Sequence, residues 1–322
     1  MVLSKSNYRF HNQCGLIQLL MTIYWGLIMP GFIPWNSQPL EDWTTKYAPG
    51  KIIELDGLPT HYIEKGSGEP VILLHGFFFD TYMWNKNIDV LAERFKVYAI
   101  DLWGFGYSTR EPLDYGYPLY TQQLLKFMDT LDIPKASLIG QSMGGGTIIN
   151  FTVSNQDRVD KIVLVDPAGL PNRLPIMGRI SNLPKFGEFI YRINNNFIRK
   201  MTLGNTFLHN KQIITDEYFE NATRFHKIKG TSEVMLYISR KQFFDTLVEE
   251  IKKLSLMNVP TLIVWGRDEK AIPLHTGQEM HRILKGSQLE ILDEAGHCAH
   301  DDQSDRFNQL TLDFLAPQIN GS

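Results

Sequence analysis

Three residues far apart in the chain, a serine, a histidine and a carboxylate, have the types and spacing needed for nucleophilic catalysis. Ser142 lies in the sequence GQSMG, which matches G-x-S-x-G between an apolar run and a helical run. A strand, a sharp turn and a helix are the context that exposes such a serine as a nucleophile. The N-terminus of the following helix favours the negative charge that develops when the serine attacks a carbonyl.

A serine nucleophile needs a base, and His297 is the candidate. It ends the sequence DEAGH, follows the last predicted strand and lies 155 residues after Ser142. An order of nucleophile, acid and then histidine along the chain is one of the known arrangements of such a triad. The imidazole would take the serine proton and later return it to the leaving group.

An orienting carboxylate for His297 is available in the turn that follows the apolar run TLIVWG. This turn reads RDEKAIP, so two adjacent acids, Asp268 and Glu269, stand at the end of a predicted strand. A carboxylate there would hold the imidazole in the right tautomer and stabilise the imidazolium. The residues alone leave open which of the two acids serves.

A loop reading LHGF after another apolar run supplies the fourth part, an oxyanion hole. The backbone N–H groups of Phe77 and Met143 are expected to converge on the substrate oxyanion, and each such donor typically lowers the barrier by about 3 kcal/mol. His75 is expected to be structural. Phe77, Phe78 and Phe79 are expected to line a pocket or lie under a lid, with ordinary core packing as an equal alternative.

Alternating strands and helices must position these residues. A hairpin turned at Asp56-Gly57 is followed by six short apolar runs that end in Gly, Asp or His, typical of strands buried on both faces of a mostly parallel sheet. Such alternation predicts an open α/β sheet with right-handed crossovers. Helices are predicted over residues 84–95, 120–131, 144–154, 276–284 and 303–315.

One segment interrupts the alternation. From about residue 171 to 254 no strand is predicted, and the composition is helical and rich in Phe, Ile, Met and Asn. This segment has 14 basic and 8 acidic residues, a charge of +6. A helical insertion between two strands predicts a lid over the carboxyl edge of the sheet, where ligands bind in such folds.

The first forty residues differ from the rest, because no charged residue occurs between Arg9 and Glu41. Residues 15–35 form an apolar stretch about as long as one membrane span, interrupted by Pro30 and Pro34. The favoured interpretation is a signal anchor or interfacial helix that attaches the protein to a membrane surface. A helix packed on the body, which would fit a cytoplasmic protein, and a cleaved signal peptide are the alternatives.

Composition excludes several classes. A net charge of −3 gives no basic field for nucleic acid, so no nucleic-acid partner is expected, and two cysteines make no disulfide framework. A metal site could be imagined at His297, Cys298, His300, Asp301 and Asp302, but a catalytic His297 with no metal is preferred. Asp301 or Asp302 is then expected to cap the following helix.

Taken in order, HGF, DLWGFGYS, GQSMGG, WGRDE with its later Pro, and GH resemble the α/β-hydrolase superfamily over about residues 51–316. The lidded branch that they resemble includes carboxylesterases, meta-cleavage-product (C–C bond) hydrolases, epoxide hydrolases and haloalkane dehalogenases. The resemblance implies an α/β-hydrolase fold, with a mostly parallel central sheet, flanking helices and a helical lid. It also implies one catalytic domain over residues 41–322, after an apolar segment at 1–40.

The resemblance bears on the choice of acid. In this family the turn commonly reads W-G-x-x-D-x-x-x-P, with the acid four residues after the Trp. Trp265 and Pro273 frame the pattern here, and the matching position is Glu269. Glu serves in some triads of this fold, so Glu269 is favoured, and Asp268 stays an alternative because the shorter acid is commoner. Asp166, after KIVLVD, is a weaker third candidate, since some relatives carry the acid there.

Serine at position 142 argues against the dehalogenases and epoxide hydrolases, which use an aspartate nucleophile. The chain is therefore interpreted as a carboxylesterase-like or lipase-like serine hydrolase, without cofactor, that cleaves small hydrophobic esters through an acyl-enzyme. The alternative is a C–C bond hydrolase, whose relatives commonly carry Trp after the catalytic histidine, where this chain has Cys298. A non-catalytic binding module on the same fold is the third hypothesis.

Overall fold

The computed structural model describes residues 33–172, 182–188 and 196–316, and within them the core is one mixed sheet. Its strand order is β1-β2-β4-β3-β5-β6-β7-β8. The first two pairings, β1 with β2 and β2 with β4, are antiparallel and the others are parallel. The strands are β1 Lys51–Leu55, β2 Leu58–Lys65, β3 Pro70–Leu74, β4 Lys96–Ile100, β5 Ala136–Gln141, β6 Val159–Val165, β7 Thr261–Gly266 and β8 Gln288–Leu292.

The predicted mostly parallel sheet and its opening hairpin are confirmed. Every residue of β5 and β7 is buried, as expected of central strands covered on both faces. The hairpin between β1 and β2 turns at Asp56 and Gly57, whose φ angles of 53° and 76° are those that a two-residue hairpin turn requires.

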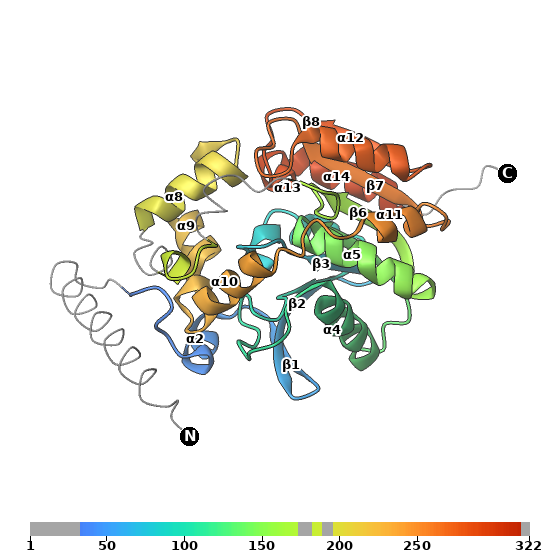
Figure 1. Ribbon diagram of the computed structural model, residues 1–322. Helices are drawn as coiled ribbons and strands as arrows, with labels where there is room; N and C mark the ends of the chain where they lie inside the picture. Colours follow the sequence, from blue (N-terminus) through green and yellow to red (C-terminus); the bar gives the residue numbers. More distant parts are fainter. Residues whose placement is uncertain (1–32, 173–181, 189–195, 317–322) are drawn as a thin grey trace, which may run out of the picture.

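Helices cover both faces of the sheet (Figure 1). The helices pack into two different apolar clusters: α4, α5, α11 and α12 into one, and α3 and α14 into the other. Within β3, Ile72 and Leu74 belong to the first cluster, whereas Val71 and Leu73 belong to the second, because side chains alternate along a strand. The helices are α3 Ile88–Leu91, α4 Tyr117–Thr130, α5 Met143–Ser154, α11 Val248–Leu254, α12 Leu274–Ile283, α13 Ala299–Asp302 and α14 Ser304–Leu315.

The helix predicted over residues 84–95 is wrong in its extent. The structure has a short 3₁₀ turn at Thr81–Trp84 and then only α3. Between them lies Asn87, a fully buried residue whose side-chain amide donates to Asn308 Oδ1 at 2.8 Å and to the His300 carbonyl at 3.2 Å. These contacts with α13 and α14 use Asn87 to join distant parts of the chain, and the helix is interrupted there.

Between β6 and β7 the described residues form helices and turns, and no strand, as expected of a lid. Figure 1 shows α8, α9 and α10 gathered on one side of the sheet, next to α2 (Leu40–Tyr47). The elements of this region are α8 Asn196–Thr202, a π-helical turn at Leu203–Phe207, 3₁₀ turns at Lys211–Ile213 and Arg224–Lys227, α9 Asp216–Thr223 and α10 Thr231–Lys241.

The chain enters the described structure against the lid. Trp35 is buried, and the Arg199 guanidinium of α8 lies 4.1 Å from the centre of its ring. Gln38 pairs with Ile228 in an isolated parallel bridge. Most of the apolar stretch at residues 15–35, on which the membrane-anchor interpretation depends, lies outside the described residues. Among the residues that are described, no helix is long and apolar enough to span a bilayer.

Candidate active site

Ser142 occupies the sharp turn that the G-x-S-x-G pattern predicts. It stands between β5 and α5 with φ 50° and ψ −114°, and its side chain is nearly buried. Its N–H donates to the Val165 carbonyl at 2.9 Å, which ties the turn to the end of β6. A Cβ on Gly144 would lie 2.3 Å from the Leu74 carbonyl oxygen, so the helix can pass this close to β3 only with glycine there.

The HGF loop lies directly against this turn. A Cβ built on Gly76 would come within 3.2 Å of the Ser142 Cβ. His75 is fully buried, and its Nδ1–H donates to the Gly76 carbonyl at 2.8 Å while its Nε2 accepts from the Leu102 N–H at 3.0 Å. Burial lowers the pKa of His75, so the neutral ring braces the loop. His75 therefore has the structural environment expected of it.

The two predicted oxyanion donors flank Ser142. Met143 is the first residue of α5, so its N–H has no acceptor within the helix. Phe77 follows Gly76, which touches Ser142. Neither backbone N–H donates a hydrogen bond to any part of the chain that the structure describes. Two free donors beside one serine are the arrangement that an oxyanion hole needs.

His297 and Glu269 are brought together from loops that follow β8 and β7. His297 Nδ1 is hydrogen-bonded to Glu269 Oε2, and both side chains are buried. The other carboxylate oxygen, Oε1, accepts from the N–H groups of Ile272, at 3.1 Å, and Ala271. These contacts turn the Glu269 side chain inward. Because Nδ1 of His297 is bonded to Glu269, Nε2 is the imidazole nitrogen left for the nucleophile.

The loop of the histidine is also joined to the turn of the serine. The Gln141 side chain, next to Ser142, donates from Nε2 to the His297 carbonyl at 2.7 Å. Ser142 Oγ itself makes no hydrogen bond within the described residues. A loose contact between nucleophile and base is common before substrate binds. Gln141 is a site residue that the sequence pattern did not reveal, since a G-x-S-x-G pattern leaves its position free.

The two other candidate acids lie elsewhere. Asp268 is 44% exposed and pairs through Oδ2 with His209 Nδ1 of the lid at 3.0 Å. Asp166 is buried at the end of β6, where Oδ1 accepts from the Gly266 N–H at 2.9 Å. Burial, together with the nearby Glu269 carboxylate, raises the pKa of Asp166 well above its ordinary value. Neither carboxylate is hydrogen-bonded to His297 in the described structure.

The expectation that Asp301 or Asp302 caps α14 is wrong. The residue before α14 is Gln303, and the helix has no side-chain cap. Asp301 is buried, where it pairs with Lys86 at 2.7 Å and accepts from the Tyr218 hydroxyl at 2.6 Å. Among the described residues no group of three or more His, Cys, Asp or Glu side chains is arranged to hold a metal ion.

Asp302 instead fastens the lid to the loop of the histidine. Its Oδ2 accepts from the N–H groups of His209 at 2.9 Å and Gly296 at 2.8 Å, while Oδ1 accepts from the Asn210 N–H at 2.9 Å. Gly296 immediately precedes His297. Sequence patterns could not reveal the contact with the lid, because His209 and Asn210 stand more than ninety residues away from Asp302.

Aromatic rings gather on the HGF loop and beside the candidate base. The Phe77 ring lies 5.4 Å from that of Phe244 and 4.2 Å from that of Phe78. Phe207 of the lid lies 5.8 Å from the His297 ring. Phe79 is buried, and its ring lies 5.3 Å from that of Phe207. All three phenylalanines of this loop therefore contact aromatic residues of the lid segment.

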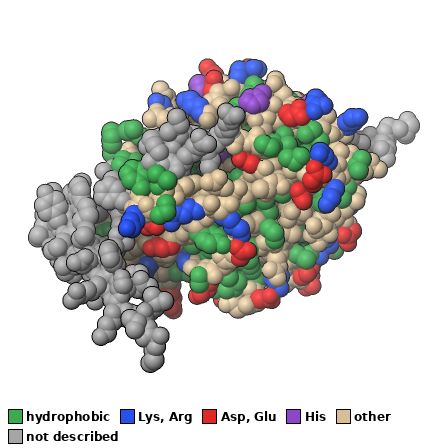
Figure 2. All heavy atoms as spheres, in the orientation of Figure 1, with side chains coloured by type: hydrophobic (Ala, Val, Ile, Leu, Met, Phe, Trp, Pro, Cys, Tyr) green, Lys and Arg blue, Asp and Glu red, His purple; other side chains and the backbone are tan. Residues whose placement is uncertain are grey.

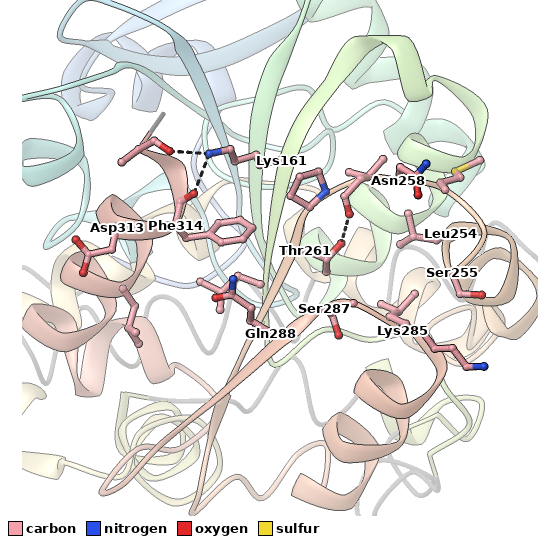
Figure 3. Close-up of a pocket in the computed structure, with 18 residues that line it drawn as sticks. Lys161, Leu254, Ser255, Asn258, Thr261, Lys285, Ser287, Gln288, Asp313 and Phe314 are labelled. Carbon is pink, nitrogen blue, oxygen red and sulfur yellow. Dashed lines mark hydrogen bonds between the residues drawn. The ribbon is translucent and has the colours of Figure 1, made fainter. Parts of the chain in front are cut away.

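A cavity of about 850 Å³ lies away from this site, at the opposite edge of the sheet (Figure 3). Thr261 and Gln288, which line it, begin β7 and β8, whereas the candidate site residues follow the ends of strands. On its wall Lys161 donates to the Phe314 and Ala316 carbonyls and so caps the end of α14. None of the predicted site residues lines this cavity.

The sheet, the turn at Ser142 and the adjacent HGF loop define the class of α/β-fold hydrolases. The family model for the alpha/beta hydrolase fold matches residues 69–304. The chain belongs to this family, which confirms the resemblance and the fold predicted from the sequence.

Curated relatives of this chain include C–C bond hydrolases. The 2-hydroxy-6-oxo-6-phenylhexa-2,4-dienoate hydrolase of Burkholderia cepacia is 31% identical, over 86% of this chain and 98% of that protein. The 2-hydroxy-6-oxononadienedioate/2-hydroxy-6-oxononatrienedioate hydrolase of Comamonas testosteroni is 29% identical, over 87% of this chain and 99% of that protein. Among solved structures, the meta-cleavage product hydrolase of Pseudomonas fluorescens IP01 matches with 27% identity and a TM-score of 0.73, covering 82% of this chain and 97% of that one.

Proposed function

We propose that the chain is a serine hydrolase in which Ser142 is the nucleophile, His297 the base and Glu269 the orienting acid. The observation that carries this proposal is the buried His297–Glu269 pair, held beside the Ser142 turn by Gln141. His297 takes the Ser142 proton as Oγ attacks a carbonyl carbon, and the N–H groups of Phe77 and Met143 stabilise the resulting oxyanion. His297 then returns the proton to the leaving group as its bond to the carbonyl carbon breaks, and water hydrolyses the acyl-enzyme that remains.

The proposed substrate class is a 2-hydroxy-6-oxo-dienoate, cleaved at the C–C bond next to the 6-oxo carbonyl. The relatives named above support this class over the carboxylic ester that the sequence first suggested, because both are hydrolases of 2-hydroxy-6-oxo-dienoates. The aromatic rings of Phe77, Phe207 and Phe244 fit an apolar group on the acyl side. Esters are the second class, since attack on either carbonyl develops the same oxyanion.

Two substrate panels separate these classes. The first panel holds 2-hydroxy-6-oxo-dienoates with methyl or phenyl at the 6-oxo carbon, and their turnover is measured as loss of the dienol absorbance. The second panel holds p-nitrophenyl esters of increasing chain length. We expect kcat/KM for the best dienoate to exceed that for the best ester by at least about tenfold, a difference of about 1.4 kcal/mol in barrier. A higher value for an ester would assign the chain to the esterases, and turnover of neither would favour a binding module.

A second proposal concerns where the hydrolase acts. We propose that the lid side of the molecule rests on a lipid surface through α8 and the apolar stretch at residues 15–35. On α8, Phe197 is 69% and Met201 47% exposed, and Figure 2 shows hydrophobic side chains gathered on that face. Trp35, the last residue of that stretch, stacks on Arg199 of the same helix. The net positive charge of the lid favours anionic lipids.

Vesicle flotation tests the lipid proposal. Wild type should float with phosphatidylglycerol vesicles, and Phe197→Ser with Met201→Ser should lower its partition coefficient about tenfold, because two exposed apolar side chains no longer insert. Leu256→Ser is the matched control, since Leu256 is 87% exposed but follows α11, away from α8. Equal flotation of wild type and the double variant would reject α8 as the contact.

A further inference from the structure

The loop that carries the Phe77 N–H contains a strained turn. The Phe79 N–H donates to the Gly76 carbonyl at 3.3 Å, which closes a four-residue turn over Phe77 and Phe78. Phe78, the third residue of this turn, has φ +74°. A turn with positive φ at that position normally carries glycine or asparagine there, because a larger side chain is strained. Something outside the turn must therefore hold Phe78 in this conformation.

His226 of the lid makes a hydrogen bond to this turn. It lies in the 3₁₀ turn Arg224–Lys227, and its Nε2–H donates to the Phe78 carbonyl at 3.1 Å. Its Nδ1 accepts from the Arg199 guanidinium at 2.8 Å, which leaves the proton on Nε2. Burial, and secondarily the Arg199 charge, lowers the pKa of His226 well below its ordinary value, so the ring stays neutral.

The seat of His226 is itself fixed. The ring of the fully buried Phe225 lies 4.1 Å from the His226 ring, and the His226 carbonyl accepts from the Asn36 N–H at 3.0 Å. The Trp35 ring meets the His226 ring edge-on at 6.2 Å. The imidazole therefore has one orientation from which to donate to Phe78, and that orientation is set by the lid and by the N-terminal part of the described chain.

We infer that His226 is a positioning residue of the proposed hydrolase: from the lid, it holds the Gly76–Phe79 turn in the strained conformation that presents the Phe77 N–H to the oxyanion. This inference rests on the proposed function, because it assigns His226 a part in the same site. His226 acts through Phe78 and is not itself a catalytic residue. The charge on the oxyanion exists only during reaction. Loss of the His226 hydrogen bond should therefore slow the chemical step and leave substrate binding unchanged.

Covalent labelling by a fluorophosphonate measures this step without knowledge of the substrate, because attack by Ser142 places charge on the phosphoryl oxygen. For His226→Leu we expect the maximal labelling rate to fall on the order of 10- to 100-fold, with the half-saturating probe concentration unchanged. This fall is smaller than the one expected when an oxyanion-hole donor is removed completely. His226→Gln keeps an amide donor for the Phe78 carbonyl, and should restore the rate to within about fivefold of wild type.

A double-mutant cycle separates positioning from general stability. Glycine adopts positive φ without strain, so in a Phe78→Gly background the change His226→Leu should cost less than about threefold in labelling rate. Equal costs in both backgrounds would overturn the inference. If His226→Leu is too unstable to be assayed, the comparison of His226→Gln with His226→Asn replaces it. The shorter asparagine amide does not reach the Phe78 carbonyl, so the inference predicts a lower labelling rate for His226→Asn. A purely structural role predicts equal labelling rates for the two variants at equal stability.

Failure of the inference and failure of the proposed function give different results. Absence of labelling in wild type, or labelling that persists in Ser142→Ala, contradicts the proposed function. Labelling of wild type that depends on Ser142, but proceeds at the same maximal rate in His226→Leu, supports the function and overturns the role of His226.

Discussion

Replacement of Ser142 by alanine should abolish both turnover and fluorophosphonate labelling, with kcat lowered at least about 10⁴-fold. The reason lies in the turn between β5 and α5, where Ser142 stands beside Phe77 and Met143, whose N–H groups donate no hydrogen bond within the described residues. Removal of the hydroxyl removes the bond-forming atom and leaves only binding and oxyanion stabilisation. Rates are measured with the best substrate of the two panels.

Ser137→Ala is the matched control for this prediction. Ser137 lies on β5, the strand that leads to Ser142, is also nearly buried, and donates to Asp160 Oδ2 at 3.3 Å near the opposite end of that strand. Its loss should change kcat by less than about threefold, as expected for a weak, partly exposed hydrogen bond. Substantial turnover by Ser142→Ala, with Ser137→Ala unaffected, would mean that another group attacks the substrate.

Glu269→Gln should lower kcat about 10³- to 10⁴-fold, whereas the neighbouring change Asp268→Asn should leave it within about threefold. Glutamine in place of Glu269 retains an oxygen for the Ile272 N–H but no longer offers a carboxylate to the His297 Nδ1–H. The imidazole then loses the negative partner that favours its tautomer and its protonated form. Asp268 is half-exposed and pairs with His209 of the lid, so its charge contributes little to His297.

The two variants differ by one position and remove the same charge, so each controls for the other. Steady-state kcat and KM, with thermal midpoints to verify folding, are sufficient measurements. A collapse of the rate in Asp268→Asn alone would contradict the assignment of Glu269. A collapse in both would mean that the contact of Asp268 with the lid matters as much as the contact of Glu269 with the histidine.

The parts of the structure that local rules determine could be predicted from the sequence. The apolar runs that became β5 and β7 are buried throughout, and glycines around Ser142 allow the turn to form against β3. The choice between two adjacent acids could be favoured by register but not decided. Which carboxylate faces inward depends on the backbone N–H groups of Ala271 and Ile272, which donate to Glu269 Oε1.

The features that sequence could not predict depend on partners far along the chain. Asn87 interrupts the predicted helix because it bonds residues more than two hundred positions later. Asp302 follows the expected pattern of a helix cap but binds backbone N–H groups of the lid. His226 carries no motif at all, and its role emerges only from its contacts with Phe78 and Arg199.

The contacts of Asp302 make one half of the lid and the loop of the histidine a single cooperative unit. Because Asp302 accepts from His209, Asn210 and Gly296 together, the segment at residues 209–210 cannot swing outward without releasing the backbone next to His297. A motion that opened this half of the lid would also displace the loop that carries His297. Substrate must therefore enter over another part of the rim if the enzyme is to stay assembled while it exchanges substrate for product.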